Sequence, residues 1–503
     1  MNFFHPYINF WRLQLFGQQT LVSSVSKSLR GNMRDIEILT RDGATISLSA
    51  SALTGLAGRV AGTLLLRGDA TYDVVRKVWN GMVDRRPALI ARCARSEDVV
   101  ACVRFAREHD LSISVRGGGH NYGGTSVSEG GMMIDLSAMR AVSIDPVARI
   151  ARAAAGLRLG EFDAAAAEHG LATTLGINTD TGIAGLTLGG GYGWLAGRFG
   201  LACDNLIGAE VITADGRRVE VTESANADLL WGLRGAGANL GIVTRLDYRL
   251  HPLGPVMGGL VIYSIEHGPA ALRLFDDYAA SCPDDVSMTG LLLHAPDGAP
   301  AIGIGLCYAG PLDKADAVVA PLLRPLPVLA NLLEVQPYTK LQTLFDSVWP
   351  PGRLYYSKSS IARRLSAEAI DCLVTHGRAM PTPLSAIAFQ QLHGAAARIG
   401  ASETAFPHRF DHLSMYVHPA TDDPAQARTI VDWARRCWAA MQPFMEPAVY
   451  VNGIEDLGEE GSLRVREAYG VNYDRLARLK ARYDPANFLS GNSNITPRVE
   501  NSP

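Results

Sequence analysis

The stretch VRGGGHNYGG, residues 115–124, places five glycines around His120 directly after an apolar, β-branched run. Glycine has no Cβ atom, so its backbone N–H groups can approach a ligand closely and φ can be positive. Two interpretations are open: His120 caps a turn, or a large ligand lies against bare backbone and His120 touches it. The surrounding sequence has to decide between them.

The composition is that of an ordinary globular protein, with 47% hydrophobic and 19% charged residues. The 503 residues are enough for two large domains. A formal charge of −3 gives no reason to expect nucleic acid or an anionic membrane surface as a partner. Glycine is the exception, because 51 residues are about 10% of the chain against a usual share of roughly 7%.

The seven cysteines are scattered and never form a C-x-x-C pair. This pattern indicates reduced thiols and predicts neither a disulfide framework nor a metal site. The N-terminus opens apolar but meets Arg12 early, so it is a poor signal peptide and too broken for a membrane span. We expect a cytoplasmic protein in which residues 1–55 form a loosely attached extension outside the folded unit.

Residues 56–255 mix short strands, helices and three glycine-rich loops, and Asp215-Gly216 predicts a hairpin turn. Residues 256–440 alternate strands with amphipathic helices, which is typical of an antiparallel sheet covered by helices. Residues 441–503 hold one amphipathic helix and a polar, asparagine-rich tail. Such a tail is a poor core element, so we expect it to return to the first domain. The predicted class is α+β.

GYGWLA, residues 191–196, fits the dinucleotide fingerprint G-x-G-x-x-A. That fingerprint needs a strand before it and an unbroken helix after it, whereas Gly197 and Gly200 interrupt the segment where the helix would run. The acidic residue expected about twenty positions on would be Asp215, which suits a hairpin turn better. A nicotinamide site is therefore the weaker hypothesis.

Six motifs in order together resemble the berberine-bridge-enzyme-like family of FAD-linked oxidases. The motifs are RGDATYDVVRKVWNG, RPALIARCARSEDVVACVRFAREH, SVRGGGHNYGGTSV, GIAGLTLGGGYGWLAGRFGLACDNL, LLWGLRGAGANLGIVT and YDPANFLSGNSNI. The resemblance spans residues 66–497. It implies a PCMH-type, vanillyl-alcohol-oxidase-like FAD domain at 56–255, a substrate domain at 256–440 and a C-terminal segment that returns to the flavin.

The family attaches the flavin 8α-methyl group to the histidine of R-x-G-G-H, so the resemblance implies that FAD is bound covalently through His120. Imidazole is a nucleophile near neutral pH, which suits this role. Many members add a second link through a cysteine eleven residues before the second G-G-G. That position is Asn178, whose amide cannot replace a thiolate, so a single link is implied.

The remaining cofactor contacts are implied by the same resemblance. Residues 116–121 would wrap the pyrophosphate and ribityl chain, residues 182–193 would follow the isoalloxazine and phosphates, and residues 241–243 would border the adenine. The implied FAD-binding residues are Arg116, Gly117, Gly118, Gly119, His120, Asn121, Asn178, Thr181, Gly182, Gly185, Leu186, Gly189, Gly190, Gly191, Tyr192, Gly193, Gly241, Ile242, Val243, Asn492 and Asn494.

Two tyrosines resemble active-site residues of the family. Tyr122 matches the tyrosine above the flavin, and Tyr450 in YVN matches the base proposed in alcohol-oxidising members. A phenol has an ordinary pKa near 10, so it is a base only if a cation or buried hydrogen bonds lower that value. Lys358 is a candidate cation or a surface lysine, and Tyr355 and Tyr356 line the pocket or pack in the sheet.

Alkaloid-oxidising members place a glutamate near Gln390 or Gln391, and glutamine cannot accept a proton as a carboxylate does. Alcohol, sugar or phenolic oxidation is favoured instead. His393 in the same strand is a second candidate base, with a structural histidine as the simpler interpretation. Thr181 stands where the family gates oxygen with small branched residues, which favours an oxidase over a dehydrogenase.

The sequence thus predicts an FAD-dependent oxidase that takes hydride from an alcohol and passes electrons to molecular oxygen, giving H2O2. Dehydrogenase, amine oxidase and non-oxidative rearrangement chemistry on the same fold stay open, as does a glycine-rich binding module without turnover. The expected partners are a small organic substrate and oxygen, with no nucleic acid or membrane, in a monomer or homodimer.

Overall fold

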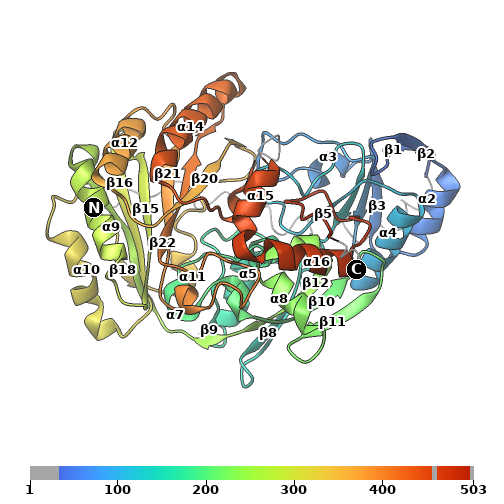
Figure 1. Ribbon diagram of the computed structural model, residues 1–503, viewed down its shortest axis with the longest axis horizontal. Coiled ribbons are helices and arrows are strands. Elements are labelled where there is room, and N and C mark those ends of the chain that lie inside the picture. The colour runs from blue at the N-terminus through green and yellow to red at the C-terminus, as the bar shows by residue number, and fades with distance from the viewer. Residues whose placement is uncertain (1–32, 456–460, 499–503) are drawn as a thin grey trace, which may run out of the picture.

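The structure, a computed structural model, describes residues 33–455 and 461–498. Two small sheets form one part of the molecule, and a large sheet covered by helices forms the other (Figure 1). The predicted α+β class, with a large antiparallel sheet in the second part of the chain, is confirmed.

The first small sheet has the strand order β3-β4-β6-β5. Its strands are β3 (Thr63–Leu66), β4 (Leu89–Arg92), β6 (Met132–Asp135) and β5 (Ile113–Arg116). The last three are parallel, because helix α4 (Ser96–Glu108) carries the chain from β4 back to the start of β5. The glycine loop that contains His120 begins directly after β5, at an edge of this sheet.

The second small sheet is antiparallel, with the order β11-β10-β12-β8-β7. Its strands are β11 (Arg218–Thr222), β10 (Leu206–Ile212), β12 (Ile242–Arg249), β8 (Ile150–Ala154) and β7 (Val142–Asp145). Gly216 adopts a φ of +75° in the turn between β10 and β11, so the hairpin predicted there is confirmed. The third glycine loop enters β12, which lies at the centre of the sheet.

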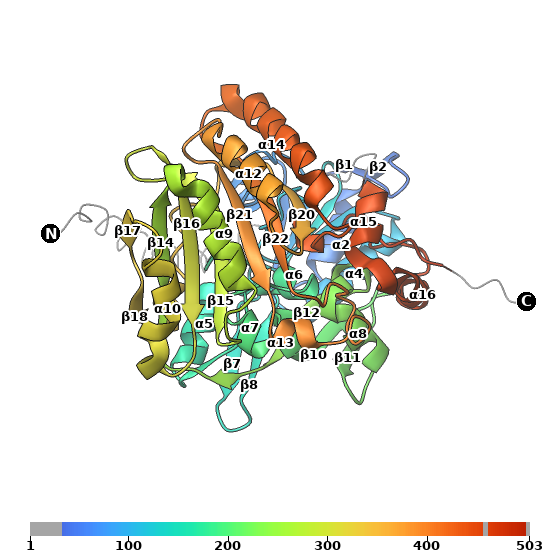
Figure 2. The same ribbon diagram turned by 60° about the vertical axis from the view of Figure 1, so that its left-hand side comes forward.

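The large sheet follows the order β17-β14-β16-β15-β21-β22-β20, with β18 also paired to β14. Its strands are β14 (Val256–Ser264), β15 (Val286–His294), β16 (Pro300–Tyr308), β17 (Ala330–Asn331), β18 (Glu334–Gln336), β20 (Lys358–Ala362), β21 (Ala386–Leu392) and β22 (His412–His418). Four helices cover one face (Figure 2): α9 (Gly268–Ala279), α10 (Ala315–Leu323), α12 (Ala367–Arg378) and α14 (Ala427–Met441). Among the described helices, none is long and apolar enough to cross a membrane.

The two faces of the large sheet pack into different cores. The outer face buries Phe389 against Phe275 of α9. The inner face joins Ala388 and Tyr416 to Trp194 from the second glycine tract. Because strand side chains alternate between faces, consecutive residues of one strand serve the helix layer and the first part of the molecule in turn.

The expectation for residues 1–55 needs correction. Residues 1–32 lie outside the described residues, but β1 (Ile36–Leu39), β2 (Thr45–Leu48) and α2 (Ala50–Ala57) belong to the folded unit. Leu53 and Leu56 of α2 are fully buried in the core that contains α4. A short hairpin with only two or three apolar positions gives a weak sequence pattern, and its burial comes from contacts with residues distant in sequence.

The C-terminal segment returns to the first part and crosses its surface as α15 (Gly461–Tyr469) and α16 (Tyr473–Tyr483) (Figure 1). The fully buried Lys480 ammonium donates to Asp484 (2.7 Å) and to the Asn239 carbonyl of the third glycine loop (2.9 Å). The Asn239 side chain in turn accepts the N–H of Ile495 (2.8 Å). Hydrogen bonds therefore tie the tail to the loop that precedes β12.

Replacing Lys480 by methionine should leave the Asp484 carboxylate buried without its counter-charge. Breaking a buried ion pair in this way costs about 3–5 kcal/mol, so we expect the free energy of unfolding in urea to fall by that amount. Arg428→Met is the control, because its ion pair with Asp432 is exposed and 3.8 Å long. Equal losses in both variants would contradict a stabilising role for the buried pair.

Candidate functional site

A cavity of about 390 Å³ lies where the three glycine loops, the C-terminal segment and the inner face of the large sheet meet. It brings together most of the residues that the sequence predicted for the cofactor and the reaction. These are Gly117, Gly118, Gly119, His120, Asn121, Tyr122, Asn178, Thr181, Gly182, Gly185, Leu186, Gly189, Tyr192, Gly241, Ile242, Val243, Tyr450 and Asn492.

Five predicted contacts do not line the cavity: Arg116, Gly190, Gly191, Gly193 and Asn494. The Arg116 guanidinium donates to the Val75 carbonyl and lies 3.9 Å from the Asp135 carboxylate, so it binds protein groups beside the loop. A Cβ on Gly193 would lie 1.6 Å from the Leu175 carbonyl oxygen. This glycine serves packing between backbones, and no ligand is needed to explain it.

Gly190, Gly191 and Asn494 lie outside the cavity wall because the backbone turns away from the cavity or is anchored elsewhere. Gly190 and Gly191 adopt φ values of +128° and +89°, a turn that only glycine makes without strain. Asn494 precedes Ile495, whose N–H is bound to the Asn239 side chain. The tail is therefore anchored at that point, and Asn492 is the residue that lines the cavity.

The first and second glycine loops touch through backbone alone. A Cβ on Gly118 would lie 2.4 Å from the Gly182 nitrogen, and a Cβ on Gly182 would lie 2.5 Å from the Gly118 Cα. Neither position can carry a side chain, because such a contact is far inside van der Waals distance. By contrast, a Cβ on Gly185 would meet nothing within 4 Å.

His120 is held from two sides. Its Nε2 atom lies 3.1 Å from the Asp180 carboxylate, and its ring stacks on Trp79 with centroids 4.4 Å apart. Burial raises the pKa of Asp180, but the hydrogen bond from His120 and the charges of His120 and Arg158 together outweigh this, and the net shift is downward. When neutral His120 donates Nε2–H to this carboxylate, Nδ1 carries the lone pair and is the nucleophilic atom.

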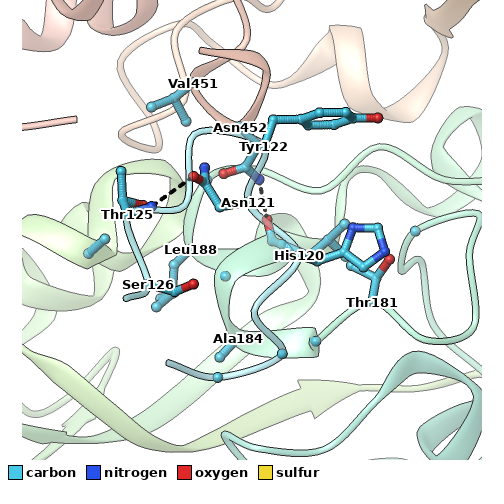
Figure 3. A pocket seen from close by; sticks show the side chains of 18 of the residues that line it. His120, Asn121, Tyr122, Thr125, Ser126, Thr181, Ala184, Leu188, Val451 and Asn452 are labelled. Atoms are coloured by element: carbon cyan, nitrogen blue, oxygen red, sulfur yellow. Dashed lines mark hydrogen bonds between the residues drawn. The ribbon is translucent and has the colours of Figure 1, made fainter. Parts of the chain in front are cut away.

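The neighbouring Asn121 has a different task. Its side-chain oxygen accepts the backbone N–H of Thr125 (3.2 Å), which closes the loop on itself. Figure 3 shows the Asn121 amide and the His120 ring pointing to opposite sides of the loop. The loop is therefore braced on one side and presents its histidine on the other.

Tyr450 does not meet the condition set for a base. Its oxygen accepts the Gly191 N–H (2.9 Å) and the Asn452 amide (2.7 Å), two contacts that favour a phenolate. Burial nevertheless dominates and raises the pKa of Tyr450. With two donors directed at the oxygen, the Tyr450 proton is free to be donated in a third direction.

Tyr122 lines the cavity beside its own loop, and burial raises the pKa of this phenol well above its ordinary value. The charge of Glu455 raises it further. Tyr122 packs edge-on against Trp79 with centroids 5.1 Å apart. Both predicted tyrosines are therefore neutral at physiological pH.

The structure separates Gln390 from Gln391. Gln390 lines the cavity, whereas Gln391 faces the helix layer, where its amide contacts the Met288 N–H (3.2 Å) and the Ala279 carbonyl (2.5 Å). His393 contacts the Val286 carbonyl (2.7 Å) and does not line the cavity, which supports the structural interpretation.

The residues of YYSKS all lie outside the cavity wall. Tyr355 stacks on Trp79 at 3.9 Å, and the Tyr356 hydroxyl accepts from Arg435 (3.2 Å) at the helix layer. The Lys358 ammonium lies 5.3 Å from the Trp438 ring. Lys358 is therefore not the cation that would lower the pKa of Tyr450. Tyr355 and Tyr356 pack against neighbouring side chains and do not line the cavity.

Several contributors to the site were not predicted from the sequence. Asp180 and Trp79 hold His120, and Asn452 holds Tyr450. Tyr416 and His418 line the cavity from β22. The alternation in MYVH, residues 415–418, was a usable signal, because a strand that packs against a site shows every second side chain to it.

The cavity suits FAD by its own chemistry. Five buried polar atoms of lining residues have no hydrogen-bond partner among the described residues: Ser126 Oγ, Asn178 Nδ2, Trp349 Nε1, His418 Nδ1 and Asn492 Oδ1. Buried polar atoms without partners each cost about 1–3 kcal/mol, so a polar ligand is expected to satisfy them. Glycine-rich backbone can supply N–H groups to phosphate oxygens.

Comparison with known proteins agrees with this site. The family description "FAD binding domain" matches residues 87–222, and "Berberine and berberine like" matches residues 449–496. An FAD-linked oxidoreductase of Aspergillus terreus is 30% identical over 468 residues, which cover 87% of this chain and 94% of the relative. The chain belongs to the berberine-bridge-enzyme-like family of FAD-linked oxidoreductases.

Other members of this family include enzymes with named substrates. (R)-6-Hydroxynicotine oxidase of Paenarthrobacter nicotinovorans is 27% identical over 87% of this chain and 97% of that protein. The crystal structure of 6-hydroxy-D-nicotine oxidase from Arthrobacter nicotinovorans aligns with a TM-score of 0.79 at 26% identity, covering 87% and 98% of the two chains.

The family fold also settles the nicotinamide hypothesis. In this oxidoreductase, Gly191 follows α6 (Ile183–Leu188), so a helix stands where the dinucleotide fingerprint needs a strand. The helix after it, α7 (Ala196–Phe199), has only four residues. The match of residues 191–196 to that fingerprint is accidental.

Gly185→Leu should block the FAD site while leaving the fold intact, because its side chain would enter open space beside the cavity. We expect purified protein with little or no bound flavin but an apoprotein melting temperature close to that of the unaltered chain. Gly118→Ala is the matched contrast. It should lower stability by about 1–3 kcal/mol through overpacking against Gly182. Full flavin content in Gly185→Leu would show that FAD lies elsewhere.

Proposed function

We propose that this FAD-linked oxidoreductase is an oxidase whose flavin is attached once, through His120, and which oxidises an alcohol. The observation that carries the proposal is the setting of His120 in the cavity wall, with Nε2 held 3.1 Å from the Asp180 carboxylate so that Nδ1 keeps the lone pair when Nε2–H is donated. Asn178 lines the same cavity and offers no thiolate for a second link.

Bound FAD would accept a hydride from the substrate carbon and pass two electrons to dioxygen. The protein has to bind and orient the alcohol and manage its hydroxyl proton. Tyr450 supports the alcohol assignment, because Gly191 and Asn452 hold its oxygen and leave its proton for a substrate oxygen. Gln390 stands on the cavity wall where an acid would be expected for alkaloid chemistry.

Oxygen as electron acceptor is supported by Thr181, a small branched residue that lines the cavity. A dehydrogenase of the same fold is the second candidate, since a berberine bridge enzyme variant described as a reticuline dehydrogenase shares the fold with a TM-score of 0.81 at 22% identity. The oxidase and the dehydrogenase differ only in how fast the reduced flavin reacts with dioxygen.

His120→Ala should release the flavin on acid precipitation, because a methyl group cannot form the covalent bond. In the unaltered protein we expect yellow colour in the pellet and a flavin mass on the peptide that contains His120. Asp180→Asn should lower the fraction of covalently bound flavin while FAD still binds. Colour in the supernatant of the unaltered protein would overturn the attachment.

Thr181→Leu should slow reoxidation of the reduced enzyme, because a longer side chain narrows access to the cavity. We expect a decrease of about tenfold, a barrier change of about 1.4 kcal/mol. The reoxidation rate is measured without a substrate by reducing the enzyme with dithionite and mixing it with air-saturated buffer in a stopped-flow instrument. The rate of reduction in the absence of oxygen is the control and should be unchanged. Slow reoxidation in the unaltered protein would favour the dehydrogenase.

A further inference from the structure

Six residues of the large sheet form the wall of the cavity opposite the glycine loops. They are Thr289 and Leu291 of β15, Ala388 and Gln390 of β21, and Tyr416 and His418 of β22. Each strand contributes alternate positions, so the three pairs stand on one face. We call this set the substrate wall.

Near-parallel aromatic rings continue the substrate wall. The His418 ring stacks on Tyr416 at 5.1 Å and 13°, and on Tyr122 of the glycine loop at 5.1 Å and 9°. Trp349 meets His418 edge-on at 6.3 Å. A cavity bounded by parallel rings favours a ligand that is itself flat.

His418 carries an unused hydrogen-bonding atom in this apolar setting. Its Nδ1 is buried and has no partner among the described residues. An unsatisfied buried nitrogen costs about 1–3 kcal/mol, and a ligand hydroxyl would remove that cost. This histidine lies in none of the sequence motifs, and neither flavin attachment nor the Tyr450 hydrogen bonds involve it.

The cavity offers no counter-charge to a ligand. Among the described residues that line it, none is aspartate, glutamate, lysine or arginine. The glycine loops can supply backbone N–H groups to the phosphates of FAD, but a charged substrate at the substrate wall would lose its hydration without gaining an ion pair, which is strongly unfavourable. Neutral ligands do not meet this barrier.

We propose that the substrate is a flat, uncharged aromatic alcohol whose hydroxyl proton is accepted by His418. This inference rests on the proposed oxidation of an alcohol and names its substrate class and its base. Gln390 and Tyr450 flank the reacting oxygen as hydrogen-bond partners, and the parallel rings hold the aromatic part.

The step balances in atoms and charge. The substrate O–H bond breaks as its proton moves to an imidazole nitrogen of His418, and the neighbouring C–H bond breaks as hydride leaves with its electron pair for FAD. The C–O bond becomes a carbonyl. The positive charge on His418 is balanced by the negative charge that crosses with the hydride, so the cavity remains neutral overall.

His418 is neutral over the working pH range. Burial lowers the pKa of His418 to about 3. The titratable groups that face it are Tyr416 on its own strand and Tyr122 on the glycine loop, both neutral phenols, while Glu455 acts on Tyr122. A lowered pKa keeps the imidazole unprotonated as pH falls, so flavin reduction should stay constant well below the ordinary histidine pKa of about 6.5.

Ligand charge is tested with benzamide, benzamidinium and benzoate, which are flat, similar in shape and not oxidisable. Calorimetry on the holoenzyme should show benzamide binding at least about tenfold more tightly than either ion, because only the ions are desolvated without compensation. Tighter binding of benzamidinium or benzoate would overturn the neutral substrate class.

His418 is tested with phenol and anisole, in which a methyl group replaces the hydroxyl proton and removes the hydrogen-bond donor. The unaltered enzyme should prefer phenol by about 5- to 10-fold, the worth of one hydrogen bond. His418→Phe keeps a stacking ring and should abolish that preference, whereas His418→Gln keeps an acceptor and should retain part of it. His376→Gln, on the outer helix α12, is the control and should behave as the unaltered enzyme.

Anaerobic bleaching of the flavin by benzyl alcohol separates this inference from the proposed function. A decrease of about 10²–10⁴-fold in His418→Phe, with benzamide affinity unchanged, supports His418 as the base. Unchanged bleaching in His418→Phe, or a phenol preference that survives the substitution, would overturn the role of His418. If no alcohol bleaches the unaltered enzyme while the phenol preference still depends on His418, the proposed alcohol oxidation is wrong. The role of His418 as acceptor of a ligand hydroxyl proton is then retained.

Discussion

The backbone contact between Gly118 and Gly182 is the constraint on which the site depends. No side chain fits at either position, so two glycine loops from distant parts of the sequence lie against each other. That contact brings Asp180, two residues before Gly182, to the imidazole of His120. The position of His120 in the cavity wall and the carboxylate that orients its ring are consequences of one close approach.

The large sheet completes the site because its two faces are assigned to different partners. Helices cover one face, and the other closes the cavity over the glycine loops. Alternation along β21 gives adjacent glutamines opposite roles: Gln391 binds the helix layer, and Gln390 reaches the ligand side. A family fold that keeps its FAD domain can change substrates by exchanging these alternate residues.

Burial keeps four ionisable residues of the cavity wall neutral. Burial raises the pKa values of Tyr122, Tyr416 and Tyr450, and it lowers the pKa of His418. Because the described lining residues contribute no acid, lysine or arginine, the electrostatics of the site are set by backbone dipoles and neutral side chains. Such a site suits hydride transfer from a neutral donor, since no fixed charge has to be rearranged.

The sequence by itself determined the α+β class, the hairpin at Gly216 and the placement of His120 beside a large ligand site. These features depend on local patterns: glycine content, alternation and spacing along the chain. Tertiary structure decided which of those residues face the cavity. Arg116 binds the Val75 carbonyl instead, and His418 joins the wall although it lies in none of the sequence motifs. The physical reason is that burial, ring stacking and pKa are set by neighbours far apart in the chain, whose approach a linear pattern does not contain.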